Sequence, residues 1–220
     1  MESDVNKIVF YFGKLKQHTT SSMWYKIWYP EKNNGNKNEQ KKIRNTFAIN
    51  YILKNLLTDL NTIALLAVEK EEENDAFRAF LKQQDSGAVD SVVHRINDII
   101  TPQIDCTACG NCCKSLMINI TPEETSSLAT RLQMDVELVK EKFIEISEQG
   151  KMIINTIPCH FLGGTSCTIY ENRFTECREF PHLHKKDFTS RLFGTLMYYA
   201  MCPIIFNVVE TLKDELNYQQ

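Results

Sequence analysis

Cysteine is the residue type in this chain whose number and spacing could do chemistry. Four cysteines fall within eight residues, and four more lie C-terminal to them: Cys106, Cys109, Cys112 and Cys113, then Cys159, Cys167, Cys177 and Cys202. The first 105 residues contain none. Thiolates bind soft metal ions, carry out redox reactions or form disulfides. We therefore interpret the eight cysteines as one functional group built by the second half of the chain.

The bulk composition helps to choose among these uses. A net charge of -3 and a pI near 6.0 give no field that would attract nucleic acid or an acidic membrane. The acidic N-terminus lacks the basic start of a secretory leader, and polar residues interrupt the most apolar window, residues 49–68. We expect a cytoplasmic protein with no nucleic-acid or membrane partner. A reducing cytosol disfavours disulfides, so the cysteines favour metal binding.

Two residues between cysteines is the spacing at which a tight turn directs two thiolates at one metal. Cys106, Cys109 and Cys112 repeat that spacing, as in a bacterial ferredoxin, where a distant cysteine followed by proline completes a [4Fe-4S] site. Cys202-Pro203 has that form. We call Cys106, Cys109, Cys112 and Cys202 the first set, and predict an iron-sulfur cluster there.

The remaining cysteines are sufficient for one closed tetrahedral zinc site, and we call them the second set: Cys113, Cys159, Cys167 and Cys177. Two zinc ions and no iron is an alternative. The sequence alone leaves the partition of the cysteines open, because adjacent Cys112 and Cys113 can serve different metals or bridge a pair. His160 or His182 could replace one thiolate, and His184 is a weaker candidate. Unligated, buried thiols are the alternative to any metal.

The elements that must position these cysteines are mainly helical. Residues 1–101 carry helical apolar periodicity, including a continuous helix over 49–67 and another ending near Pro102, apart from a polar loop at 30–42. We predict two domains: an N-terminal helical bundle, residues 1–101, and a C-terminal cysteine-rich metal-binding lobe, residues 102–220, with little or no β-structure.

Local signals refine the second half. Thr121, Pro122 and Glu124 predict a capping box, and the helix that it starts should bend near Met134 and continue past Ile146 to Gly150. Residues 152–157 are β-branched and predict a strand, with residues 167–170 as its hairpin partner. Residues 204–216 predict a final amphipathic helix.

Several motifs in one order resemble a known family. They are Cys106-x2-Cys109-Gly110-x-Cys112-Cys113, then ITPEE at 120–124, CTIYENR at 167–173 and CREFP at 177–181. Together they look like the CxxCxxCC proteins, the YkgJ-type cysteine-cluster family of zinc- or iron-chelating domains, over about residues 104–206. The family commonly has Arg-Pro where this chain has Arg173-Phe174. Flagellin lysine methylases carry a similar cluster, which implies that some relatives modify proteins.

Three functions are compatible with these observations. The first is a binding or electron-handling module that holds iron-sulfur, zinc or both, and docks a protein partner. The second is a protein-modifying enzyme, which rests on the resemblance alone, because the chain shows no S-adenosylmethionine motif and no nucleophile-base pair. The third is a structural or interaction protein in which zinc supplies folding energy.

Overall fold

The structure is a computed structural model that describes residues 49–50 and 52–219. The chain divides into two compact units, Met1–Lys54 and Asn55–Gln220. The described residues of the first unit are helical, whereas the helices and the polar loop predicted within residues 1–48 lie outside the described residues. The described part is mainly α with small antiparallel sheets, as predicted. It contains no helix with the length and apolar character needed to cross a membrane.

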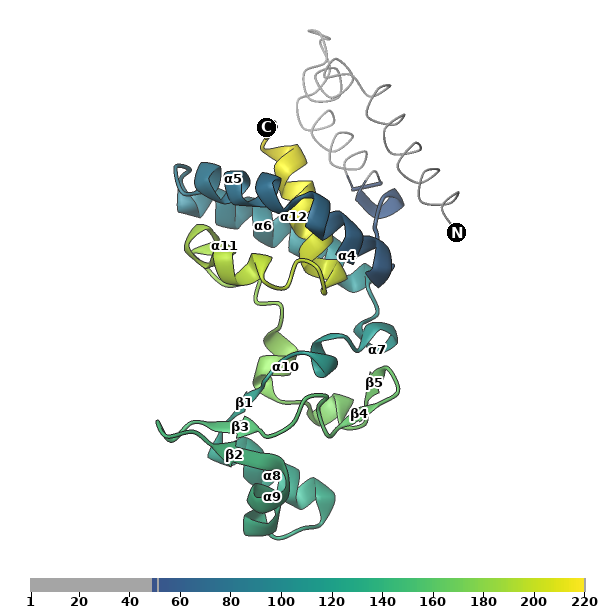
Figure 1. Ribbon diagram of the computed structural model, residues 1–220, viewed down its shortest axis with the longest axis vertical. Helices are drawn as coiled ribbons and strands as arrows, with labels where there is room; N and C mark the ends of the chain where they lie inside the picture. The colour runs from purple at the N-terminus through teal and green to yellow at the C-terminus, as the bar shows by residue number, and fades with distance from the viewer. Residues whose placement is uncertain (1–48, 51, 220) are drawn as a thin grey trace, which may run out of the picture. The chain divides into compact units, whose positions relative to one another are not determined.

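Five helices of the second unit form what we call the helical group (Figure 1). They are α4 (Leu60–Glu69), α5 (Glu71–Leu81), α6 (Ser86–Ile100), α11 (Phe188–Leu196) and α12 (Pro203–Glu215). Helix α6 packs against both α11 and α12, and α4 contacts α5 and α12. The inward sides of these helices carry fully buried Phe77, Ile96 and Leu212. The helical group is thus built from both ends of the unit.

The predicted continuous helix over residues 49–67 is wrong, because the chain leaves the helix after Lys54 and α4 begins only at Leu60. Asp59 caps α4, its carboxylate accepting from the amide of Thr62 at 2.8 Å. In the gap, the side-chain amide of Asn207 bonds both the backbone N–H and the C=O of Leu57, at 2.9 and 2.7 Å. Capping and a long-range amide therefore outweigh the apolar periodicity.

The predicted boundary between residues 101 and 102 has packed helices on both of its sides. Helix α6 ends at Ile100, before the boundary. It packs against α11 and α12, which lie after the boundary, on either side of Cys202 in the chain. A buried carboxylate strengthens this junction: Asp90 of α6 accepts from the backbone amides of Asp187 and Phe188 at the start of α11, both at 2.8 Å. The division into domains stays a prediction.

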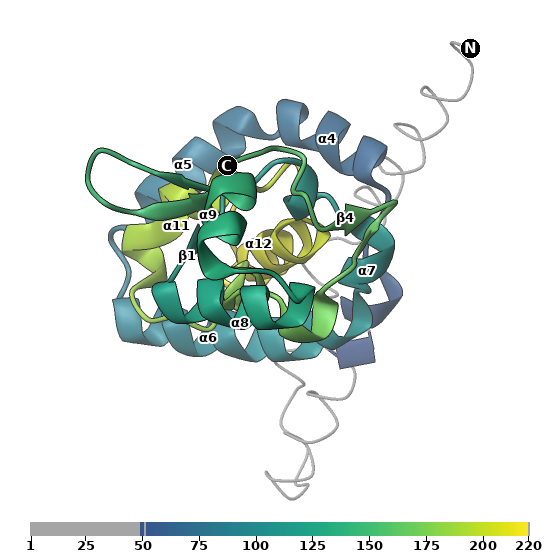
Figure 2. The same ribbon diagram turned by 90° about the horizontal axis from the view of Figure 1, so that it is seen from below.

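The segment between α6 and α11 is composed of short elements. In chain order they are η1 (Thr101–Gln103), α7 (Cys106–Cys109), η2 (Cys112–Lys114), β1 (Asn119–Ile120), α8 (Pro122–Leu132), α9 (Val136–Phe143), β2 (Ile144–Ile146), β3 (Met152–Ile154), β4 (Leu162–Gly163), β5 (Ser166–Cys167), η3 (Tyr170–Asn172) and α10 (Thr175–Glu179). Helices α8 and α9 lie side by side (Figure 2), and α9 leads directly into β2.

Several local predictions for this segment are confirmed. Thr121 and Glu124 form the capping box of α8, and Gln133 interrupts the helix in the left-handed region, at φ 53°, next to the predicted bend. Strand β3 forms where the β-branched run predicted it. The final helix begins directly after Cys202, also as predicted.

Two local predictions are wrong. The helix does not continue to Gly150, because residues 144–146 form β2 and pair with β3. The hairpin partner of β5 is β4, whereas β3 lies between β1 and β2 in an antiparallel sheet. Pairing β3 with both neighbours buries Ile144 and Ile154 in a common core. Local periodicity does not report this long-range burial of apolar surface.

That core supports three members of the second set. Its buried residues come from β1, α8, α9, β2, β3 and the segment after β3: Ile118, Ile120, Leu128, Ala129, Val139, Ile144, Ile154, Phe161, Ile169 and Phe174. Cys159, Cys167 and Cys177 are partly buried against it. The core therefore gives a common base to three thiols that are well separated along the chain.

Candidate metal centre

The eight cysteines are all free thiols, and the loop that carries four of them has a defined local structure. We call residues 106–113 the thiol loop. It begins at α7, whose N-cap Asp105 accepts from the amide of Thr107 at 2.8 Å. Gly110 ends α7 in the left-handed region, at φ +59°, and the chain then turns through η2. This sequence of turns brings all four cysteines onto a short arc of backbone.

Gly110 lies against the β4–β5 hairpin that carries Cys167. A Cβ atom added to Gly110 would lie 2.2 Å from the backbone oxygen of Thr165, far inside normal contact. Helix α7 and β5 also contact each other (Figure 1). Glycine is therefore required here both by the positive φ and by the close approach of the hairpin.

The other two members of the second set are also attached by hydrogen bonds. The amide of Cys159 donates to the carbonyl of Cys113 at 2.8 Å, which joins one member of the set to another. Cys177 lies on α10. The residue before it, Glu176, accepts from the backbone amide and the side-chain amide of Asn119, each at 2.8 Å. These bonds hold Cys177 beside β1 and the core below it.

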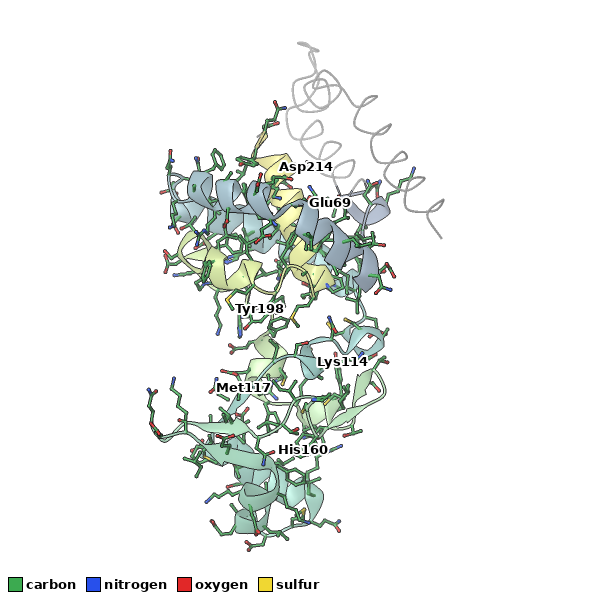
Figure 3. The ribbon with its side chains drawn as sticks, in the orientation of Figure 1. Glu69, Lys114, Met117, His160, Tyr198 and Asp214 are labelled. Atoms are coloured by element: carbon green, nitrogen blue, oxygen red, sulfur yellow. The ribbon has the colours of Figure 1, made fainter. Side chains whose placement is uncertain are left out.

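The four thiols of the first set line one small cavity of about 30 Å³. The rest of its wall is mainly apolar and comes from both sides of the chain: Ile104, Gly110, Phe180, Pro181, Met201, Pro203 and Ile204. The rings of Phe180 and Tyr198 contact each other edge to face, with centroids 5.5 Å apart. Tyr198 lies at the lower edge of the helical group in Figure 3. The cavity thus combines four soft donors with a mainly apolar wall, while Cys106 remains exposed to solvent.

Burial raises the pKa of the Cys202 thiol to about 12, and the nearby thiols Cys106 and Cys109 add to the rise. The amides of Ile204 and Ile205, at the first turn of α12, act in the opposite direction. Burial likewise raises the pKa of Cys106, with Cys109 as the next cause. The pKa values of Cys202 and Cys106 therefore both depend on other thiols of the first set.

The second set shows a separate pattern of mutual influence. Burial raises the pKa of Cys177 to about 12, followed by the effects of Cys113, Cys159 and Cys167, which are the other three members. A hydrogen bond between the adjacent thiols lowers the pKa of Cys112 and raises that of Cys113. The two sets thus meet at these neighbouring residues.

The positive charge of Arg173 acts on thiols of both sets. Its guanidinium carbon lies 4.0 Å above the ring of Tyr170, and Nη1 donates to the Tyr170 carbonyl at 2.9 Å. The charge acts to lower the pKa of Cys106 in the first set and of Cys167 in the second, against the larger effect of burial. A guanidinium at this position offsets part of the negative charge that thiolates would bring.

The histidines named as possible substitutes for a thiolate have other contacts. His160 is exposed, and its Nε2 lies 2.7 Å from Oδ1 of Asn155 (Figure 3). Nδ1 of His182 lies 3.8 Å from a carboxylate oxygen of Glu179. His184 is also exposed and lies in the turn before α11. None of these three histidines lines the first-set cavity.

The thiols of each set are gathered but stand apart. Across the described residues 49–50 and 52–219, no three cysteine, histidine or acidic side chains are arranged closely enough to hold an ion as they stand. The four residues of the first set nevertheless line one cavity, and Cys113, Cys159 and Cys167 all raise the pKa of Cys177. The effects also cross between the sets, because Cys113 raises the pKa of Cys106 and Cys177 acts on Cys112. Cysteine side chains turn about a single bond, whereas the backbone decides which thiols are neighbours.

The site also contains functional candidates that sequence reasoning missed. Asn111 donates from Nδ2 to the carbonyl of Met201 at 3.0 Å, next to Cys202. Its position inside the cysteine motif was the available signal, but its partner lies 90 residues away. The apolar wall from Phe180 and Pro181 was likewise visible only in three dimensions.

Comparisons with known proteins give one match. Neither curated proteins nor solved structures produced a match to the chain. The matched range of the family model ends before Cys202, so it contains seven of the eight cysteines, where the sequence motifs predicted a range reaching about residue 206. Residues 105–193 of this chain match the model of the family CxxCxxCC, described as "Putative zinc- or iron-chelating domain".

Proposed function

We propose that the protein binds metal through two sets of four thiolates and acts as a binding or electron-handling module. The first set would hold a [4Fe-4S] cluster and the second set one zinc ion. The observation that carries the proposal is the cavity that Cys106, Cys109, Cys112 and Cys202 all line, although Cys202 is far from the others in sequence. The match to a zinc- or iron-chelating family supports metal binding in general.

The donors of the first set suit an iron-sulfur cluster, and its cavity of about 30 Å³ would have to widen to admit one. Three cysteines at two-residue spacing with a fourth before a proline are typical of four-iron sites. The apolar side chains Phe180, Met201 and Ile204 would lie beside a bound cluster, where an apolar wall tunes the potential. When bound, such a cluster accepts and donates single electrons.

The second set fits a structural zinc ion. Its four thiols come from four places: the thiol loop, the segment that leads into β4, strand β5, and helix α10. Three of them pack against one hydrophobic core. Zinc prefers four thiolates in a closed tetrahedral site, and such a site adds folding free energy. The very short elements between residues 101 and 180 would gain most from that stabilisation.

A single metal ion at either set requires the thiols to come closer than they stand here. Any metal requires them to lose their protons. Because burial raises the pKa of Cys177 and Cys202 to about 12, both are protonated at neutral pH without metal. A bound metal would displace these protons. The positive charge of Arg173 would then offset thiolate charge in both sets.

The test is an anaerobic preparation of the full chain, with iron, zinc and sulfide counted per chain and visible absorption recorded. We expect about four iron atoms and one zinc ion per chain. Cys202→Ser should remove the iron and the visible absorption and keep the zinc, whereas Cys177→Ser should remove the zinc. Each variant thus serves as the matched control for the other.

A colourless wild-type protein with neither metal would refute the proposal. Zinc at both sets and no iron would refute the cluster and leave a structural zinc protein. If Cys202→Ser and Cys177→Ser lost the same metal, the division into two sets would be wrong.

A further inference from the structure

Asn111 joins the thiol loop to the helical group by a directed bond. Its side-chain nitrogen donates to the backbone carbonyl of Met201 at 3.0 Å. A carbonyl only accepts, so the group that faces it must be the NH₂ and not the oxygen of the amide. The residue after this carbonyl is Cys202, the fourth member of the first set.

Cys202 is fixed to the helical group rather than to the thiol loop. Its amide donates to the carbonyl of Tyr198 at 3.0 Å, and its carbonyl accepts from Phe206 at 2.9 Å. Helix α12, which follows, packs against α6. The other three thiols of the set belong to the thiol loop, so the set is complete only when loop and helical group keep their register.

The other contacts around the cavity do not fix that register. Ile104, Phe180 and Ile204 contribute apolar surface, and apolar attraction has no preferred direction. A hydrogen bond between an amide and a carbonyl does have a preferred direction, and it fixes the donor–acceptor distance within a few tenths of an ångström. Asn111 lies between Cys109 and Cys112, so its bond acts directly beside Cys112, the last of the three first-set thiols in the loop.

We propose that Asn111 is a positioning residue of the first set, which holds the Met201 carbonyl so that Cys202 can complete the set begun by the thiol loop. This inference rests on the proposed two-set metal binding. It assigns Asn111 to the first set alone, because the second set is attached to the loop through Cys113 and the β4–β5 hairpin. Loss of the amide should therefore weaken one set and spare the other.

The experiment uses the full chain, reduced and stripped of metal, titrated with Co²⁺ under anaerobic conditions. Iodoacetamide labelling read by mass spectrometry then reports which thiols the metal protects. Asn111→Ala and Asn111→Asp both remove the donor. We expect Co²⁺ affinity at the first set to fall about tenfold to a hundredfold, as for other residues that orient metal ligands. Cys106, the exposed thiol of the first set, should become labelled at a Co²⁺ concentration that still protects Cys167 of the second set.

Asn97→Ala is the matched control, because Asn97 is also half-buried and its side chain accepts one hydrogen bond, from Thr101 at 2.9 Å. It should leave both sets unchanged. Circular dichroism checks that each variant folds; if Asn111→Ala does not, Asn111→Ser, whose hydroxyl is too short for this contact, takes its place.

Unchanged labelling of Cys106 in the folded Asn111 variants would overturn the proposal. Equal loss of protection at Cys167 and Cys106 would also overturn it, because Asn111 would then act on the fold as a whole. A wild-type chain that binds no Co²⁺ would instead refute the proposed function, and this outcome is read before any variant is made.

Discussion

Replacing Gly110 by alanine tests whether the thiol loop must touch the hairpin that carries Cys167. Two separate penalties should follow. Alanine at φ +59° costs about 1–2 kcal/mol through the left-handed backbone. The added Cβ would also lie 2.2 Å from the Thr165 oxygen and 2.8 Å from its carbonyl carbon, so about 1 Å of backbone must move. Such overpacking costs about 1–3 kcal/mol.

The chain supplies a control for the first penalty. Gly164 has φ +67°, lies in the same hairpin, and a Cβ added there would meet nothing within 4 Å. Gly164→Ala should therefore carry only the backbone cost of about 1–2 kcal/mol. Gly150, at φ +75° and equally open, repeats the control outside the hairpin. The difference between Gly110→Ala and either control isolates the contact with Thr165.

Urea unfolding of the metal-free, reduced protein, followed by circular dichroism, gives the three free energies. We expect Gly110→Ala to lie about 1–3 kcal/mol below Gly164→Ala, and its second set to bind Co²⁺ more weakly, because the shifted hairpin moves Cys167. If the three alanine variants have equal stability, the close approach between loop and hairpin does not exist as described, and the geometric account of the second set fails with it.

Two further perturbations act on other parts of the structure. In the metal-free protein, the pKa of Cys177 and of Cys202 is about 12, above the ordinary 9.0 of an unfolded thiol, so their contribution to stability is complete below pH 9 and is lost as the pH rises toward 12. The free energy of unfolding should fall across that range by at most about 1.4 kcal/mol per pH unit for each thiol, and a flat urea-unfolding profile would contradict the burial of these groups. Removing the carboxylate in Asp90→Ala should cost about 2–4 kcal/mol in the same assay, because the amides of Asp187 and Phe188 lose their acceptor inside the protein. Asp90→Asn, which keeps one oxygen, should fall between alanine and wild type, and equality of all three would refute the role of this cap.

Local signals predicted elements well where the physics is local. The capping box at Thr121 and Glu124 satisfies amides within one helical turn, and the β-branched run at residues 152–154 favours a strand whatever its partner. Pairing is different, because β3 and β5 could pair across the Gly163-Gly164 turn by sequence alone. The observed order β1-β3-β2 depends on burying Ile144 and Ile154 together, which no local pattern reports.

The break in the helix predicted over residues 49–67 has the same origin. Apolar spacing supports a helix through Leu57, yet that residue's backbone is bonded by Asn207, 150 residues away. Asp59 then provides a new cap for α4. The sequence contained the cap but not the competing long-range amide. For the cysteines, spacing was enough to propose two sets of four, whereas the walls of the cavity and the bond of Asn111 needed the fold.

The position of Cys202 links the first set of thiols to the packing of the helical group. All four thiols of the second set lie within residues 105–193, the range that matches the chelating family, whereas the first set takes its fourth thiol from beyond that range. Cys202 is held by the turn before α12, and α12 packs on α6, which precedes the thiol loop in the chain. A shift of α12 against α6 would therefore move one thiol of the first set and none of the second. If the proposed metals bind, the second set would behave as a property of the chelating segment, and the first would report on the packing of the helices.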